Sequence, residues 1–167
     1  MLPGPRRINL LARDTWDFGS MRHGYRWRGA SVGKRLRSAR VGAAAYDLLS
    51  DEDRSWPYHF HHGMEEWLLV VDGTPTLRHL GGEWELKAGD LVCFPPGPQG
   101  GHQLRGPGTV LLFSANRSPE AVEYPDSGKI AIRPPGKILR AEPELDYWEG
   151  EEIPEGEPAP AAPKEAP

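Results

Sequence analysis

The sequence predicts an all-β protein, an antiparallel sandwich or barrel built from many short strands. The first indication is that 20 Gly and 18 Pro are spread through the 167 residues rather than clustered. Frequent turns between short strands produce such a distribution, and long helices do not. The second indication is a regular succession of short apolar or alternating segments, with no convincing helical period. The length fits one domain with a proper core, and the pattern favours a sandwich or barrel.

Each expected strand is bounded by turn residues. Gly81 and Gly82 are a two-residue hairpin signal between segments 74–80 and 83–86. Residues 66–71 are apolar after the first position, which is typical of a strand covered on both faces. Pro57 marks a strand end or edge, because proline cannot donate to the ladder. The expected strands are residues 43–49, 55–61, 66–71, 74–80, 83–86, 91–94, 109–114, 121–124 and 129–133, and residues 145–148 are expected to form a last anchored element.

Charge divides the chain into a basic N-terminal arm (1–40), a barrel (41–149) and an acidic tail (150–167). The arm carries ten Lys or Arg against two acidic residues, a net charge of +8. Because no nucleic-acid-binding motif accompanies it and the whole chain is acidic, we expect its aromatic residues to pack on its own or a partner barrel, and no nucleic-acid partner. The tail consists mainly of Pro, Ala and Glu, which cannot bury enough apolar surface to order itself, so we expect disorder.

The single cysteine, Cys93, excludes an intrachain disulfide and suits a reducing interior. It lies in an apolar run, so we expect a buried side chain with no catalytic role. No apolar stretch approaches the ~20 residues of a membrane span, and the first residues lack the apolar region of a signal peptide. We therefore expect a cytoplasmic protein with no membrane partner.

The main chemical signal is a pair of histidines, His59 and His61, followed by Glu65 and Glu66. On a strand, residues two apart point to the same face, so the two imidazoles converge. One of the two glutamates returns to that point if the chain reverses after His62 and runs back as a second strand. Two imidazoles and a carboxylate at one centre form a site for a first-row transition metal.

These residues resemble the first motif of the cupin superfamily, small jelly-roll barrels. The motif is a His-x-His pair, three or four residues, a Glu, six residues and a Gly. Here His59 and His61 are followed after four residues by Glu66, and after six more by Gly73. The family spacing favours Glu66 as the carboxylate, and Glu65 would then point outward on the pleat.

The second cupin motif is matched in part. Gly89, Pro95 and Gly97 have its spacing, but its histidine position is Gly100, and the nearest histidine is His102. The wider glycine-rich loop can still return a side chain to the same point. The stretch is similar to a variant found in a group of bacterial cupin-2 proteins.

The resemblance, which covers about residues 8–150, implies a double-stranded β-helix barrel and a homodimer. It also implies one divalent metal ion, such as Fe, Mn, Ni, Co or Zn, because a mixed nitrogen and oxygen set without sulfur suits all of them. The implied ligands are His59, His61, Glu66 and His102. Three other histidines, His23, His62 and His79, are expected to be solvated or structural.

Two functions remain open. The first is a metal-dependent enzyme, a dioxygenase, isomerase or decarboxylase acting on a small molecule. The second is a non-catalytic module that binds a small, sugar-like ligand. The fold fixes neither, because it hosts many unrelated chemistries. Arg105 could hold an anionic substrate or simply lie on the surface. The candidates for the cavity wall are Tyr46, Trp56, Leu68, Val70, Phe94, Gln103, Leu104 and Phe113.

Overall fold

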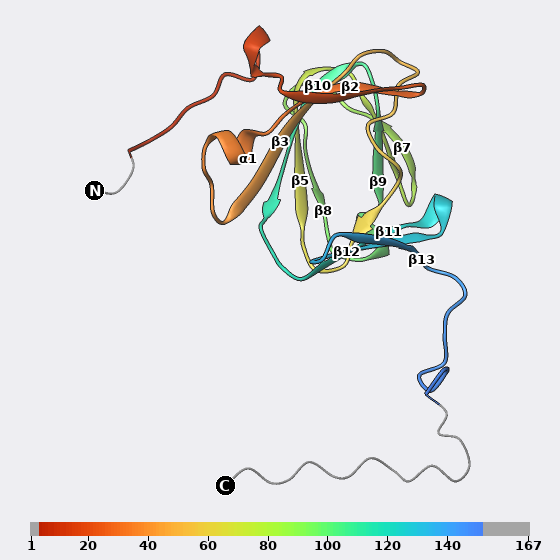
Figure 1. Cartoon of the computed structure of the whole chain (residues 1–167). Helices are drawn as coiled ribbons and strands as arrows, with labels where there is room; N and C mark the ends of the chain where they lie inside the picture. The colour runs from red at the N-terminus through yellow and green to blue at the C-terminus, as the bar shows by residue number, and fades with distance from the viewer. Residues whose placement is uncertain (1–3, 152–167) are drawn as a thin grey trace, which may run out of the picture.

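The computed structural model describes residues 4–151, which form three antiparallel β-sheets (Figure 1). The main sheet has six strands in the order β1-β2-β3-β10-β5-β8. The all-β prediction is confirmed, and most strands from residue 41 onward lie close to the expected positions, although β13 (Lys137–Arg140) was not predicted. The strands of the main sheet are β1 (Phe18–Arg22), β2 (Tyr25–Ala30), β3 (Val41–Leu48), β10 (Gly108–Ala115), β5 (Glu66–Gly73) and β8 (Leu91–Phe94).

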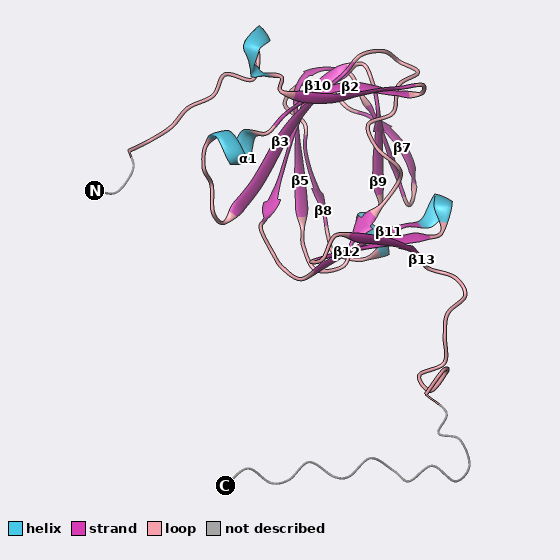
Figure 2. Cartoon of the chain, in the orientation of Figure 1, coloured by secondary structure: helices cyan, strands magenta, loops and turns pink. Residues whose placement is uncertain are grey.

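The two smaller sheets complete the barrel. Figure 2 shows the main sheet and the β7-β6-β9 sheet as two walls, with the β13-β12-β11-β4 sheet crossing one end. The bounds of these strands are β7 (Gly82–Glu85), β6 (Thr76–His79), β9 (His102–Arg105), β13 (Lys137–Arg140), β12 (Lys129–Arg133), β11 (Glu120–Tyr124) and β4 (Phe60–His61). The described helices are single turns, namely η1 (Arg13–Thr15), α1 (Val32–Arg35), η2 (Pro98–Gly100) and η3 (Pro125–Ser127).

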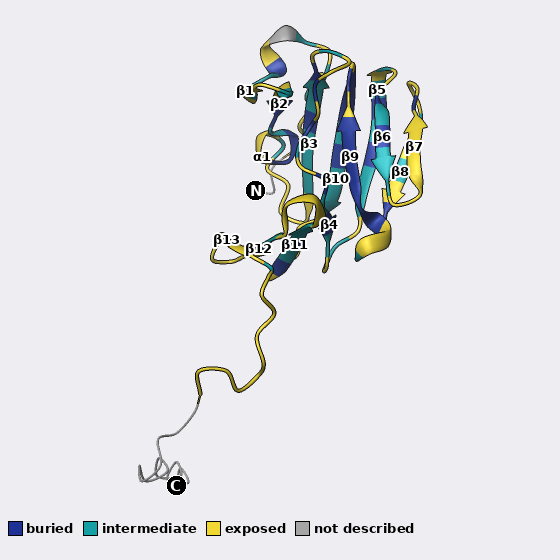
Figure 3. Cartoon of the chain, turned by 90° about the vertical axis from the view of Figure 1, so that its right-hand side faces the viewer, coloured by how far each residue is buried: buried dark blue, intermediate teal, exposed yellow. Residues whose placement is uncertain are grey.

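The core lies between the two walls and follows the strand period. On β5, Leu68 and Val70 are 0 % and 1 % exposed, because alternate residues point to the same face of a sheet. Figure 3 shows that β9 is mostly buried, whereas the edge strand β7 is exposed. The buried cluster contains residues of both walls: Leu48, Leu68, Val70, Leu77, Leu86, Phe94, Leu104, Val110 and Leu112.

The basic N-terminal segment contributes strands to the main sheet. Residues 18–30 form the β1–β2 hairpin, and β2 pairs with β3. A second small cluster of Ala30, Val32 and Ala45 lies beside it, and Ile8, Leu10 and Trp16 pack against this cluster. The boundaries at residues 40 and 149, and packing on a partner barrel, stay predictions.

Residues 55–61 form less strand than predicted. Only Phe60 and His61 are in β4, and His59 makes an isolated bridge to His102. Pro57 accounts for this, because it has no N–H to offer a neighbouring strand. The segment is therefore a loop that ends in two paired residues.

Two further predictions are wrong. Cys93 is exposed, because it lies on an edge strand of the main sheet, on the face opposite the buried Phe94. Residues 145–148 are not anchored, since Leu145, Tyr147 and Trp148 are 62 %, 83 % and 68 % exposed. Of the predicted disordered tail, residues 152–167 lie outside the described residues. Within residues 4–151, no helix has the length and apolar character that crossing a membrane requires.

Candidate metal centre

The four predicted ligands come from three parts of the barrel. His61 is in β4, and Glu66 and His102 are the first residues of β5 and β9. His59 lies beside β9, because its carbonyl accepts a 2.9 Å hydrogen bond from the peptide N–H of His102. His59 and His61 are separated by one residue and share a face. The fold therefore brings all four side chains to one end of the barrel.

The loop before β9 brings His102 back to this point despite its two extra residues. Gly97 has a φ of +85°, a left-handed conformation that favours glycine. At Gly100 a Cβ atom would collide with the carbonyl oxygen of Pro95. The tight turn of η2 follows from these two glycines, and it places His102 Nε2 3.2 Å from Glu66 Oε2.

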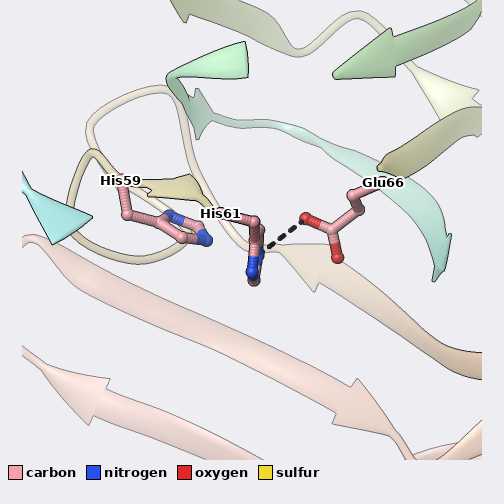
Figure 4. A group of neighbouring side chains, drawn as sticks. All are labelled: His59, His61 and Glu66. Carbon is pink, nitrogen blue, oxygen red and sulfur yellow. Dashed lines mark ion pairs between the residues drawn. The ribbon is translucent and has the colours of Figure 1, made fainter. Parts of the chain in front are cut away.

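The side chains of His59, His61 and Glu66 converge, as Figure 4 shows. Each offers one ligand atom, and these atoms lie within 4.8 Å of one another. His61 Nε2 is 3.6 Å from Glu66 Oε2. The ring of His102 lies 4.6 Å from that of His59, centroid to centroid. The prediction that the two imidazoles of the first motif point to one place is confirmed.

Backbone carbonyls fix the tautomer of two of the imidazoles. His59 Nδ1 lies 3.1 Å from the carbonyl oxygen of Pro57, and His102 Nδ1 lies 2.9 Å from that of Gly100. A carbonyl oxygen only accepts, so each Nδ1 must donate its proton. The lone pair of each neutral ring is then on Nε2. This is the outer-shell arrangement that orients metal-binding histidines.

Glu120 does the same for His61. Its Oε1 lies 3.3 Å from His61 Nδ1 and accepts bonds from the peptide N–H groups of His62 and Gly63. Glu120 is only 4 % exposed, and a Cβ at Gly63 would lie 2.6 Å from its Oε2. The glycine therefore lets the carboxylate approach, and Nε2 of His61 is directed to Glu66.

The charges of the centre favour a bound cation. Burial alone would raise the pKa of Glu66, but His102 and His61 outweigh it and hold that pKa at about 2. Burial, with the neighbouring His102 and His61, lowers the pKa of His59 to about 3. Burial would also lower the pKa of His61, yet Glu66 and Glu120 raise it. The centre thus contains an ionised carboxylate beside a neutral His59.

One buried atom is left without a partner in a way that fits a metal ion. His102 is 0 % exposed, and its Nε2 has no hydrogen-bond partner. The 3.2 Å contact with Glu66 therefore does not have hydrogen-bond geometry. Buried polar atoms are rarely left unpaired. A cation between the imidazole and the carboxylate would satisfy both, and a set of three nitrogens and one oxygen suits a first-row transition metal.

The other candidate ligands lie elsewhere. Glu65 points outward, where its Oε1 accepts a 2.7 Å bond from Trp67 Nε1. His62 lies 3.1 Å from the half-buried Glu123. His79 packs on the ring of Trp84 at 4.3 Å. None of these side chains reaches Glu66.

Aromatic rings hold the imidazoles in place. Phe94 stacks on His102, with 3.9 Å between ring centroids and 8° between planes. Tyr124 stacks on His59 at 5.8 Å. Trp56 meets the rings of both histidines edge-on, at 6.2 and 6.1 Å. The ligands are therefore supported by packing as well as by hydrogen bonds.

A cavity of about 390 Å³ opens beside the centre, within the usual range for small-ligand sites. Three of the predicted wall residues, Tyr46, Trp56 and Phe113, line it. Sequence reasoning missed Trp27, Val122, Tyr124 and Arg133. The alternation along residues 120–124 is a signal that could have found two of them.

Five predicted wall residues lie elsewhere. Leu68, Val70, Phe94 and Leu104 belong to the packed core. Gln103 points to the other side of β9, where it borders a second cavity with Arg105. Arg105 contacts Glu83 there at 3.4 Å, so it does not face the metal centre. Leu68 and Val70 share the face of Glu66 as predicted, but of these three residues only Glu66 lines the cavity.

A family comparison identifies the fold. Residues 50–115 match the model of a family described as the cupin domain. Residues 50–115 therefore form a cupin domain. This segment contains the four predicted ligands but not Glu120. Among curated proteins, no sequence matches this cupin significantly.

Solved structures agree with the assignment. A cupin-superfamily sugar phosphate isomerase from Silicibacter pomeroyi is 21 % identical, with a TM-score of 0.70 over 85 % of this chain and 98 % of that one. A candidate sugar phosphate isomerase from Acidithiobacillus ferrooxidans is 24 % identical, with a TM-score of 0.64 over 73 % and 81 %. The polyketide cyclase RemF from Streptomyces resistomycificus is 13 % identical, with a TM-score of 0.52 over 89 % and 95 %. At these identities the likeness shows the shared fold.

Proposed function

We propose that this cupin is a metal-dependent enzyme for a small oxygenated molecule. One divalent transition-metal ion is held by His59, His61, Glu66 and His102. The observation that carries the proposal is the common orientation of the three imidazoles. Each Nδ1 faces a fixed acceptor, which leaves each Nε2 for the space beside the carboxylate of Glu66. Such outer contacts set the tautomer and the aim of a metal ligand.

The donor set restricts the ion to Fe, Mn, Co, Ni or Zn in the divalent state. When bound, the ion supplies Lewis acidity and a template for substrate oxygens. An ion held by these four side chains would bring two oxygens of one substrate together beside the cavity. The cavity beside the centre provides the room for it.

Among the reaction types, isomerisation is the one for which the cavity supplies a further polar group, the phenol of Tyr46. Burial raises the pKa of Tyr46, and the charge of Glu66 adds to the shift while Arg133 opposes it. The phenol therefore stays protonated at neutral pH, where it can donate a hydrogen bond to a substrate oxygen. The names of two relatives, both sugar phosphate isomerases, are consistent with this class. Dioxygenase and decarboxylase chemistry would rest on the same metal-holding residues and cavity.

One observation favours a second candidate, a non-catalytic module that binds a sugar-like ligand. The cavity is lined by Trp27, Tyr46 and Trp56. The ring centroid of Tyr46 lies 5.2 Å from that of Trp27 and 4.9 Å from that of Trp56. Such a wall can cover one face of a sugar ring. The homodimer and the cytoplasmic location implied at the outset stay part of this proposal, and sedimentation velocity tests the first.

Elemental analysis of the purified full-length chain tests the metal claim. We expect close to one transition-metal ion per chain, and its loss in a variant that combines His59→Ala with His61→Ala. His62→Ala is the matched control, because His62 is adjacent to the pair but points to Glu123. Folded wild-type protein that takes up no ion from a supplied excess would refute the claim.

Turnover by the metal-loaded protein separates the two functions. A panel of sugar phosphates, diols and diketones is assayed for isomerisation, oxygen uptake and release of carbon dioxide. For an isomerase, Tyr46→Phe lowers kcat while leaving metal content unchanged. Saturable binding of a sugar without turnover of any panel member would favour the binding module.

A further inference from the structure

The cavity also contains a cationic side chain that the metal proposal does not use. Arg133 lines it together with Tyr46 and Tyr124. Apart from the histidines, it is the one basic residue among the described residues that border this space. Its position on β12 is separate from the strands that carry the metal ligands.

The strand register explains why Arg133 faces inward. Arg133 is directly opposite Glu120 in the β11–β12 pair, and residues directly opposite each other lie on the same face of a sheet. Glu120 is buried and contacts His61. The same face of β12 continues with the buried Ala131, opposite Val122 of the cavity wall. Arg133 thus belongs to the face that covers the metal centre.

Arg133 lacks a carboxylate partner. Within residues 4–151, the arginines that pair with an acid are Arg26, Arg28, Arg35, Arg78 and Arg105. The nearest acid by register, Glu120, directs its bonds to His61 and the backbone instead. An unpaired guanidinium at a cavity is suited to an incoming oxyanion, because its planar donors match carboxylate and phosphate in a two-point contact.

A second cation adds to the positive potential at the same place. Lys129 is on the same face of β12, opposite Tyr124, and its Nζ lies 5.3 Å from the ring of Tyr124. That ring in turn stacks on His59. A small anion entering here would therefore meet positive charge on the side of the cavity formed by β12.

We infer that the ligand of this cavity is a small hydroxylated compound with one anionic group, a carboxylate or a phosphate, which Arg133 binds while the hydroxyl oxygens reach the metal. The inference rests on the proposed function for the metal end, and Arg133 supplies the other end. Arg133 lowers the pKa of Tyr46 and Glu66 raises it, which agrees with a cavity that contains both charged groups. Arg133 is exposed, so it can change rotamer to meet a ligand.

Binding of three-carbon probes to the metal-loaded full-length protein tests this inference by isothermal titration calorimetry. The probes are glycerol 3-phosphate, glycerate and, as the neutral control, glycerol. We expect at least one anion to bind more tightly than glycerol, and Arg133→Gln to weaken that anion about 10-fold or more, as expected for the loss of a charge-assisted contact. The two anions distinguish phosphate from carboxylate.

Arg140→Gln is the matched control. Arg140 is an exposed residue of β13 in the same sheet and does not line the cavity. Its substitution removes the same charge as Arg133→Gln. We expect it to change anion binding less than 2-fold. Anion binding that is unchanged in Arg133→Gln, equally weak in both variants, or absent from the metal-loaded wild type would overturn the inference.

Metal content is measured first in each protein. A wild-type protein that binds no metal contradicts the proposed function. Metal-loaded protein whose anion affinity is unchanged by Arg133→Gln contradicts only the inference of an anionic ligand. Arg133→Lys adds a further comparison, since it keeps the charge but loses the planar pair of donors. Partial recovery of anion affinity in this variant supports direct contact.

Discussion

Removal of the Glu120 carboxylate should weaken metal binding although Glu120 is not a ligand. Its Oε1 is the acceptor for His61 Nδ1 at 3.3 Å and for the peptide N–H groups of His62 and Gly63 at 3.2 and 3.3 Å. In Glu120→Ala, His61 loses the group that fixes its tautomer, and the turn after β4 loses two bonds. Loss of an outer-shell partner typically costs 10–100-fold in metal affinity, or about 1.4–2.7 kcal/mol.

The same change should lower the free energy of unfolding by about 1–3 kcal/mol. Each unpaired donor costs about 1–3 kcal/mol when fully buried, but His62 and Gly63 are exposed enough for water to reach them. Removing Oε2 of Glu120, which is buried without a partner, offsets part of the loss. Metal affinity is therefore measured by competition with a chelator, at a temperature where the variant is fully folded by circular dichroism.

Two variants make this prediction specific. Glu123→Ala removes a half-buried acid of the same strand, whose partner is the exposed His62, and it should change neither metal affinity nor stability by more than about 0.5 kcal/mol. Glu120→Gln keeps an acceptor oxygen and should restore part of the metal affinity. A folded Glu120→Ala protein with wild-type metal affinity would show that Glu120 does not position His61.

Three further outcomes follow from the same contacts. Gly100→Ala should reduce metal affinity at least 10-fold, because its Cβ would collide with Pro95 and move the Gly100 carbonyl that holds His102. Gly136→Ala, at a position with open space but a φ of +86°, should affect only stability. Equal metal affinity of Gly100→Ala and wild type in a chelator competition would contradict this prediction. Burial alone would raise the pKa of Asp53, but bonds from Ser50 and Arg26 lower it, so its stabilisation is complete above the unfolded pKa of about 3.9 and lost as pH falls through the lower folded pKa. In urea titrations, the stability gap between wild type and Asp53→Asn should thus stay constant from about pH 5 to 7 and shrink below about pH 4; a gap that widens in acid would reverse the sign. Removing the metal with a chelator should lower the free energy of unfolding by about 2.7 kcal/mol when free metal had been at 100 times its Kd. Calorimetric unfolding measures this loss of stability, and the variant that combines His59→Ala with His61→Ala should show none.

The barrel could be predicted because its signals are local. Turn residues such as Gly81 and Gly82, and the apolar run of residues 66–71, can be recognised without knowledge of distant contacts. The N-terminal hairpin was missed because its strands are mostly exposed, so the apolar alternation that marks a half-buried strand is weak. For Cys93, an apolar neighbourhood in the sequence could not reveal that β8 is an edge strand.

For the metal centre, spacing alone placed His59 and His61 on one face, and the family motif chose Glu66. The position of His102 needed the loop geometry at Gly97 and Gly100, which the spacing of the second motif does not contain. Glu120 and Arg133 could not be found from the sequence. They follow Glu66 by more than fifty residues and reach the site only through the register of β4, β11 and β12.

Anomalous diffraction from crystals of the protein purified with its metal tests the central claim most directly. The account predicts one strong peak per chain, about 2.0–2.3 Å from Nε2 of His59, His61 and His102 and from a carboxylate oxygen of Glu66. A peak on other residues, or an ion that one of the three imidazoles binds through Nδ1, would contradict it.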